Sequence, residues 1–148
     1  EFPNIKYTCI LRDGIPEEEI LRYAKEYNPQ IIIMGTRGRS QKDIDLIGSV
    51  TAEVIERSQS FVYAIPEHTP LKTFNDIKKV AFVTNFELHY NVVKEDNILS
   101  NLDKYVKEEN IDVICITNYK RNIFARLFNP SIARKMIFHA NTPILVIK

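Results

Sequence analysis

The sequence predicts an α/β fold in which mainly parallel strands carry helices on the sheet. Residues 31–34 (Ile-Ile-Ile-Met) form an apolar run with the length and β-branched content of a buried strand. Elsewhere apolar residues recur at helical spacing, as at Ile20, Ala24 and Tyr27. Strands that alternate with helices run parallel, because each helix carries the chain back to the end of the sheet where the last strand began.

The first half of the chain can be divided into three strands and two helices. Residues 7–11 (Tyr-Thr-Cys-Ile-Leu) have the composition of a strand. A helix is expected to begin at Pro16, since proline fits the first helical turn and the three glutamates after it favour the positive end of the helix dipole. After the strand at 31–34 come a second helix, with Val54 on its apolar face, and a third strand at 61–65.

The same unit occurs twice in the chain. Residues 28–65 align without a gap on residues 110–147, an offset of 82 positions. The alignment superposes apolar runs on apolar runs, which indicates one supersecondary unit used twice. Asp96 or Asn97 can cap a helix in the second unit. The residues expected on the buried face of that helix are Ile98, Leu102, Tyr105 and Val106.

The repeat divides the chain into two units joined by a linker. The first unit spans residues 1–66. Residues 67–77 are expected to form the linker, because Pro70 within them and Pro66 just before them interrupt helix and sheet alike. The second unit spans residues 78–148 and is expected to open with a strand that starts near residue 78.

Composition argues against several classes of function. The 148 residues carry a net charge of +1, so no global charge favours nucleic acid or an anionic membrane surface as a partner. No apolar run approaches the ~20 residues of a membrane span, and none has the shape of a secretory leader, so we expect a cytoplasmic protein. Cys9 and Cys115 stand in apolar runs and are expected to be buried. The scattered histidines and serines predict neither a metal site nor a catalytic residue.

A glycine-bearing loop between the strand at 31–34 and the second helix carries the strongest functional signal. It opens with Gly35-Thr36-Arg37-Gly38-Arg39, and the helix follows Gly48-Ser49-Val50-Thr51. Glycines let a backbone approach a ligand closely, and a helix N-terminus offers free N–H groups with a partial positive charge. This arrangement predicts phosphate binding. The lysine and spacing of a Walker A loop are absent, and the glycines could also form a plain tight turn against the helix.

The spacing Gly-x-x-Gly, nine residues, Gly-Ser resembles the ATP-binding signature of the universal stress protein family. The resemblance implies a Rossmann-like, adenine nucleotide alpha hydrolase-like fold and a non-enzymatic stress-response protein that binds ATP, AMP or ADP, with or without Mg²⁺. It implies that Met34 lines the base or ribose edge and that the hydroxyls of Ser49 and Thr51 donate to phosphate oxygens. The residues expected to bind the nucleotide are Met34, Gly35, Arg37, Gly38, Arg39, Gly48, Ser49, Val50 and Thr51.

The second unit departs from this signature at every glycine. Thr117, Lys120 and Pro130 stand where the first unit has glycine, and Pro130 also removes an N–H donor. We therefore expect the second unit to bind no nucleotide and to complete the fold instead. Family members commonly dimerise through their last strand, here 61–65 and 143–147, which implies either a homodimer or pairing of the two units within one chain.

The chain is shorter than a tandem protein of this family should be. A complete domain opens with two strand–helix pairs that the first unit lacks. In the second unit no residues remain for a crossover between Phe86 and Leu88, although a crossover needs at least ~10–12. We expect a partial version of a longer tandem protein. The alternative is a minimal protein in which the strand at 80–84 continues into residues 87–93 as one bent strand or a hairpin.

Three functions are consistent with these observations. The first is an adenine-nucleotide-binding regulator. The second is an interaction module of the same fold that binds no nucleotide and acts through dimerisation, favoured by the absent first strand of unit one and the lost glycines of unit two. The third is an enzyme with slow ATP hydrolysis, for which the sequence names no catalytic residue.

Overall fold

The computed structural model describes residues 5–36, 49–67, 69–70, 73–83, 104–117 and 142–148. Residues 104–108 within these ranges are also helical. The labelled elements are α1 (Pro16–Tyr27), β1 (Ile31–Gly35), α2 (Ser49–Arg57), β2 (Phe61–Ile65), the short 3₁₀ helix η1 (Phe74–Asp76), β3 (Val80–Val83), β4 (Val113–Thr117) and β5 (Ile144–Ile147).

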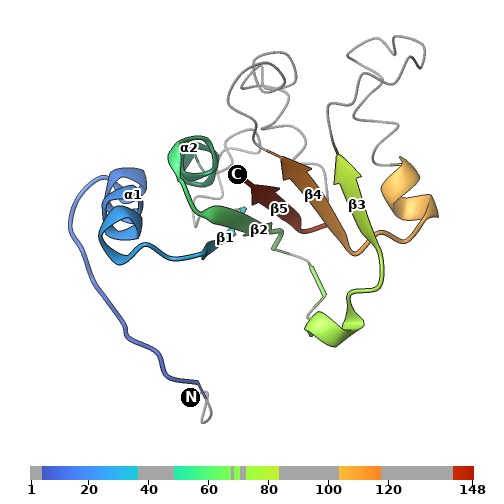
Figure 1. The fold of residues 1–148 in the computed structure, drawn as a ribbon, viewed down its shortest axis with the longest axis horizontal. Coiled ribbons are helices and arrows are strands. Elements are labelled where there is room, and N and C mark those ends of the chain that lie inside the picture. Colours follow the sequence, from blue (N-terminus) through green and yellow to red (C-terminus); the bar gives the residue numbers. More distant parts are fainter. Residues whose placement is uncertain (1–4, 37–48, 68, 71–72, 84–103, 118–141) are drawn as a thin grey trace, which may run out of the picture.

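The five strands form one sheet in the order β1-β2-β5-β4-β3 (Figure 1). The pairs β1·β2, β4·β5 and β3·β4 are parallel, whereas β2 and β5 pair in antiparallel fashion. The expected α/β fold with mostly parallel strands is confirmed, with one antiparallel junction in the middle of the sheet.

The sequence repeat has a counterpart in the strands. β1 and β4 are the same length and start 82 positions apart, at Ile31 and Val113. At the junction Tyr63 of β2 faces Leu145 of β5, and these two residues are also 82 positions apart. Within this chain the last strand of each unit therefore pairs with the last strand of the other.

The hydrophobic core lies on one face of the sheet, beneath α2. Val54 and Ile55 of α2 are buried there, with exposed fractions of 0% and 1%. They form one cluster with alternate residues of the three central strands: Val62, Ala64, Ile114, Ile116, Ile144 and Val146. Ile20 and Leu21 of α1 pack against the margin of this cluster. Side chains alternate across a strand, so these residues share the face that α2 covers.

Helix α1 begins at Pro16, as its sequence predicts, with three glutamates in its first turn. It ends at Tyr27 and is capped by Asn28, whose backbone is left-handed (φ 52°) and whose N–H donates to the carbonyl of Ala24 at 2.8 Å. The expected apolar face is only partly correct. Ile20 and Ala24 are half-buried, but Tyr27 is exposed and its ring stacks on that of Tyr23, with centroids 5.7 Å apart.

The strand expected at residues 7–11 is not formed. Residues 5–13 carry no regular structure, and the side chain of Leu11 is 95% exposed. A strand needs a neighbour for its N–H and carbonyl groups, and β1 pairs only with β2 among the described residues. For the same reason the prediction for Cys9 is wrong, because this thiol is exposed. Cys115 in β4 is buried as expected, and burial raises its pKa.

The second unit opens with the expected strand, described as β3. The carboxylate of Asp112 anchors the residues just before β3. It accepts hydrogen bonds from the backbone N–H groups of Lys78 and Lys79, at 2.8 and 2.9 Å. In the helical residues 104–108, Val106 is buried as expected, whereas Tyr105 is 52% exposed. The predictions for Asp96, Asn97, Ile98, Leu102 and the segment between Phe86 and Leu88 fall outside the described residues.

An ion pair joins the two helices of the first unit. The guanidinium of Arg57, at the end of α2, donates to both carboxylate oxygens of Glu18 in α1 and also to Glu53. The hydrogen bond from Arg57 lowers the pKa of Glu18, and the bond to Glu18 raises the pKa of Arg57. The two-pronged pair links the first turn of α1 to the last turn of α2.

Replacing Arg57 with Gln should return the pKa of Glu18 toward its ordinary value of 4.5. Because folding lowers this pKa, the stability linked to Glu18 is fully present above pH 4.5 and is lost as the pH falls through the lowered folded value. A titration of the carboxyl carbon by NMR measures the shift. Arg22→Gln is the control, since Arg22 pairs with Glu19. An unchanged Glu18 pKa in Arg57→Gln would contradict the assignment.

Truncating a side chain under α2 should destabilise the fold far more than truncating one outside it. Ile114→Ala is expected to cost about 2–5 kcal/mol, because Ile114 is 1% exposed and the substitution leaves a cavity. Ile10→Ala removes the same atoms from a residue that is half exposed and should cost much less. Urea denaturation of both variants measures the difference. Equal losses would mean that residues 5–13 are packed as tightly as the core.

Candidate functional site

The candidate site lies where β1 ends and α2 begins. The hydroxyl of Thr51, in the first turn of α2, donates to the carbonyl of Gly35, the last residue of β1, at 2.9 Å. The side chain of Thr51 is buried, so this bond lies between two packed elements. It holds the end of the strand directly against the start of the helix.

A second hydrogen bond fixes the chain as it leaves β1. The N–H of Thr36 donates to the carbonyl of Ile65 at 3.0 Å, one step beyond the last β1·β2 pair, Gly35 and Ile65. Thr36 is buried, and the sequence pattern gives no sign of a role for it. Thr36 directly follows β1, whose residues alternate between exposed and half-buried instead of being buried as the apolar run predicts. The first residues of the loop are thus anchored to both α2 and β2.

The start of α2 has the electrostatics of an anion site. The first N–H groups of a helix have no acceptor within the helix, and the dipole concentrates positive potential there. The first turn of α2 holds no acidic residue that would neutralise this potential. An anion at this end of α2 would therefore meet the N–H donors that begin the helix, next to Gly35.

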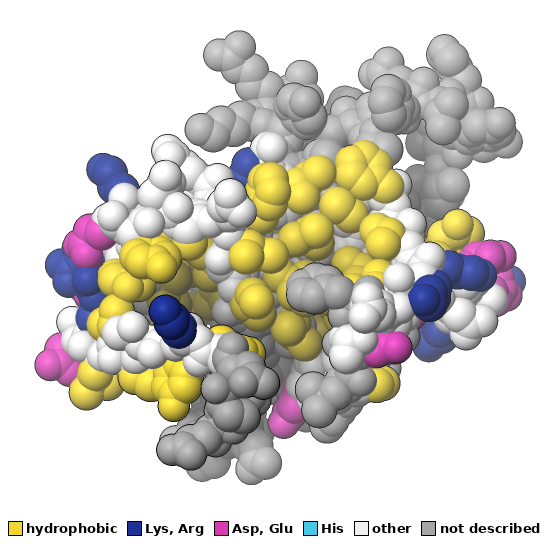
Figure 2. Space-filling view, turned by 60° about the horizontal axis from the view of Figure 1, so that its bottom comes forward, with side chains coloured by type: hydrophobic (Ala, Val, Ile, Leu, Met, Phe, Trp, Pro, Cys, Tyr) yellow, Lys and Arg dark blue, Asp and Glu magenta, His cyan; other side chains and the backbone are white. Residues whose placement is uncertain are grey.

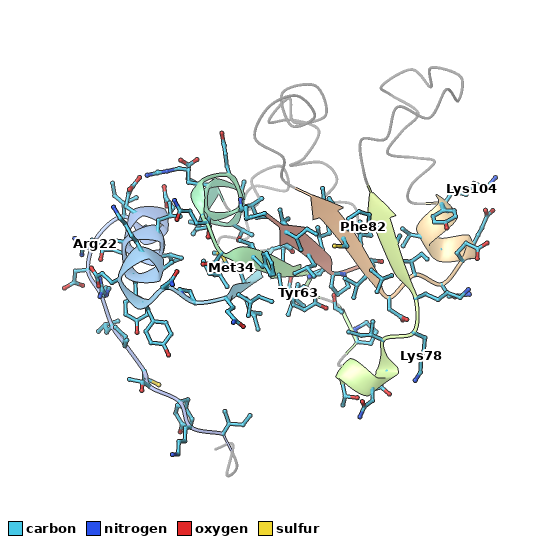
Figure 3. All side chains as sticks on the ribbon, in the orientation of Figure 1. Arg22, Met34, Tyr63, Lys78, Phe82 and Lys104 are labelled. Atoms are coloured by element: carbon cyan, nitrogen blue, oxygen red, sulfur yellow. The ribbon has the colours of Figure 1, made fainter. Side chains whose placement is uncertain are left out.

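The structure locates five of the nine expected binding residues. Gly35 is exposed at the end of β1, and Ser49, Val50 and Thr51 form the first turn of α2. Met34 packs against the margin of the core, on the face opposite that of Tyr63 (Figure 3). Arg37, Gly38, Arg39 and Gly48 lie outside the described residues.

Two of the roles expected from the resemblance need revision. The hydroxyl proton of Thr51 goes to Gly35 rather than outward, so the contribution of Thr51 to an anion would come from its backbone N–H. Met34 has only part of its side chain free, because it packs beneath α2 with the core. Sequence spacing places both residues near the site but does not reveal these neighbours.

Other chemistry finds no support in the described part of the chain. No group of three or more His, Cys, Asp or Glu side chains is arranged there to hold a metal ion. Nor is any helix among those residues long and apolar enough to cross a membrane.

Comparison with known proteins bears on this site directly. Residues 1–66 match the universal stress protein family, and this range contains β1, the loop and α2. Residues 1–66 belong to the universal stress protein family. The resemblance recognised in the glycine spacing is thereby confirmed for the first unit of the chain.

Two universal stress proteins from archaea are similar to the same part of the chain. One, from Methanothermobacter thermautotrophicus, is 34% identical over 65 residues, which are 44% of this chain and 44% of that protein. The other, from Methanocaldococcus jannaschii, is 42% identical over 62 residues, which are 42% of this chain and 38% of that protein. The chain therefore spans less than half the length of each of these relatives.

The fold also resembles a solved universal stress protein. The crystal structure of a universal stress protein from Archaeoglobus fulgidus matches with a TM-score of 0.63 and 18% identity, over 90% of this chain and 65% of that one. At this identity the likeness concerns the fold alone. It reaches beyond residue 66, so the second unit shares in the universal stress protein architecture.

Removing the hydroxyl of Thr51 should loosen the junction between β1 and α2. Thr51→Val keeps the shape of the side chain and should destabilise the protein by ~1 kcal/mol, because the carbonyl of Gly35 loses its partner. Thr69→Val is the matched control. The buried Thr69 hydroxyl has no hydrogen-bond partner within the described structure, so its loss should be neutral or stabilising. Denaturant midpoints compare the two, and equal effects would argue against the bond.

Proposed function

We propose that the first unit binds an adenine nucleotide (ATP, or AMP or ADP) between the end of β1 and the start of α2. We also propose that the protein acts as a non-enzymatic regulator in a stress response. Membership of residues 1–66 in the universal stress protein family supports both statements. The observation that carries the proposal is the 2.9 Å bond between Thr51 and Gly35, which joins a strand end to a helix start that has no acid in its first turn.

In this proposal the phosphates lie over the N–H groups that begin α2. Backbone donors suit phosphate because they are already oriented by the helix and cost little further ordering. Gly35 has no side chain to obstruct the approach of the ligand at the end of β1. Arg37 and Arg39 supply charge-assisted hydrogen bonds, and Gly38 and Gly48 let the loop close on the ligand.

We further propose that each chain binds one nucleotide. The equivalent of Gly35 in the second unit is Thr117, at the end of β4. Because β2 and β5 pair in antiparallel fashion, β1 and β4 run in opposite directions. Their C-terminal ends therefore lie at opposite ends of the sheet's strands. The second unit therefore cannot contribute the end of its strand to the site of the first.

A second candidate function is an interaction module that binds no nucleotide. One observation favours it. β4 pairs with β3 on the side away from β5. By contrast, β1 has no neighbouring strand on the side away from β2 in the described structure. A nucleotide at the end of β1 would lack that flanking strand. In this reading the pairing of β2 with β5 takes the place of the family's contact between last strands of two chains.

Thermal melting with and without ATP–Mg²⁺ should separate the two candidates. A ligand at ~100 times its dissociation constant adds about 2.7 kcal/mol of stability, which is a rise of several degrees for a domain of this size. The rise should disappear in Gly48→Val, because a branched side chain obstructs approach to the helix start. It should persist in Gln59→Val, which places the same side chain at an exposed residue beyond the far end of α2.

The outcome is decided by the parent and its two variants together. A rise that disappears only in Gly48→Val supports nucleotide binding by the first unit. No rise in a well-folded parent would reject it for this chain and favour the interaction module. A rise that survives in Gly48→Val would place the nucleotide elsewhere. Repeating the melt with AMP would show whether the terminal phosphates contribute.

A further inference from the structure

Residues 5–13 form an extended segment, which we call the arm, that runs alongside α1 before the chain turns into this helix (Figure 1). The arm makes no backbone hydrogen bond to the described part of the chain, and every side chain in it except that of Arg12 is exposed. Arg12 also donates the one side-chain hydrogen bond that joins the arm to other described residues. The polar contacts that hold the arm against α1 therefore come from a single residue.

The guanidinium of Arg12 contacts acidic and aromatic groups of α1. Its Nη2 donates to Oε2 of Glu26 at 2.7 Å, and its Nη1 lies 3.8 Å from Oε2 of Glu19. The central carbon of the guanidinium lies 4.7 Å from the centre of the Tyr23 ring. These three residues share one side of α1, because they are three or four positions apart. We call Glu19, Tyr23 and Glu26 the guanidinium site.

The guanidinium site suits arginine better than lysine. A guanidinium is planar, so it can donate to a carboxylate along its edge while its face lies over an aromatic ring. An ammonium group has no such face. The ring of Tyr23 is itself held by stacking on Tyr27, with centroids 5.7 Å apart and planes 11° from parallel. The site therefore offers its ring and carboxylates in a fixed arrangement on one helix.

The core does not require Arg12 in this site. Arg57 joins α2 to α1, and the pair of Arg22 with Glu19 lies within α1. Arg12 differs from both, because it joins α1 to an arm that contributes no residue to the hydrophobic core. Another arginine could replace it without disturbing the packing of the sheet and helices.

We propose that the guanidinium site binds an arginine in an extended segment of another protein, and that the arm fills the site within the chain until such a partner displaces it. The arm indicates the form of the ligand, which is an arginine in an extended chain after apolar residues such as Ile10 and Leu11. A tethered ligand competes at an effective concentration in the millimolar range, so a partner must make further contacts to displace it.

Charge favours a basic partner. Helix α1 contains four glutamates against one arginine and one lysine, so a basic segment approaches it with favourable electrostatics. The guanidinium site lies entirely on α1 and uses neither the glycine loop nor α2. The proposal is therefore independent of nucleotide binding.

A peptide with the sequence of residues 5–13, carrying Cys9→Ser to prevent oxidation, is the probe. The full chain with Arg12→Gln should bind it at least about tenfold more tightly than the parent does, because the arm of the variant no longer offers a guanidinium that competes. An NMR titration of the α1 amide signals measures both dissociation constants. The same peptide with Arg12→Gln should not bind, and one with Arg12→Lys should bind more weakly.

Two further variants locate the peptide on the protein. Glu26→Gln, added to Arg12→Gln, should weaken binding at least about tenfold, because the charge-assisted hydrogen bond to the peptide is lost. Glu53→Gln in the same background is the matched control, since Glu53 lies on α2 and pairs with Arg57. It should leave the dissociation constant unchanged, and equal losses in the two variants would overturn the proposal.

The carboxyl of Glu26 gives an independent readout. Its hydrogen bond from Arg12 lowers its pKa, so Arg12→Gln should return this pKa toward 4.5 and the peptide should lower it again. No binding to Arg12→Gln, or equal binding to the parent, would overturn the proposal. So would a peptide that binds without lowering this pKa. Exchange of arms between copies, seen as a dimer that Arg12→Gln disperses, would also contradict it.

Discussion

The antiparallel pairing of β2 with β5 is the contact on which the rest of the structure depends. It converts two sets of parallel strands into one sheet, with Tyr63 facing its repeat equivalent Leu145. Val62, Ala64, Ile144 and Val146 lie in this junction and also form the centre of the core. Without the junction, β1 and β2 alone would form a two-stranded sheet, and the core would lose its contacts between β2 and β5.

The junction also separates the corresponding strand ends of the two units. Because of it, the C-terminal ends of β1 and β4 lie at opposite ends of the sheet's strands. One unit keeps glycine at the end of its strand, and the other has Thr117. The unit with glycines offers a helix start free of acidic residues, and the other unit supplies strands and core. The proposed nucleotide site is therefore local to the first unit, while the core is built by both units.

Local chemistry was sufficient to predict some elements, and contacts distant in sequence decided the others. Helix α1 was predictable because Pro16 and the glutamates after it act within one turn. Residues 7–11 have the composition of a strand but none of the described strands beside them, so the prediction failed. Glycine spacing points to the candidate site, yet the bond from Thr51 to Gly35 joins residues sixteen positions apart and could not be read from spacing. The family resemblance suggested that the last strands pair, but neither it nor the alignment of the two units gave the direction of the pairing.

The most direct test of the account is an NMR measurement of contacts between β2 and β5. A sample mixed from isotope-labelled and unlabelled chains separates contacts within a chain from contacts between chains. The account predicts backbone proton contacts typical of antiparallel strands, joining Val62–Ala64 to Ile144–Val146, within single chains. The same contacts found only between labelled and unlabelled chains, or in a parallel pattern, would contradict it.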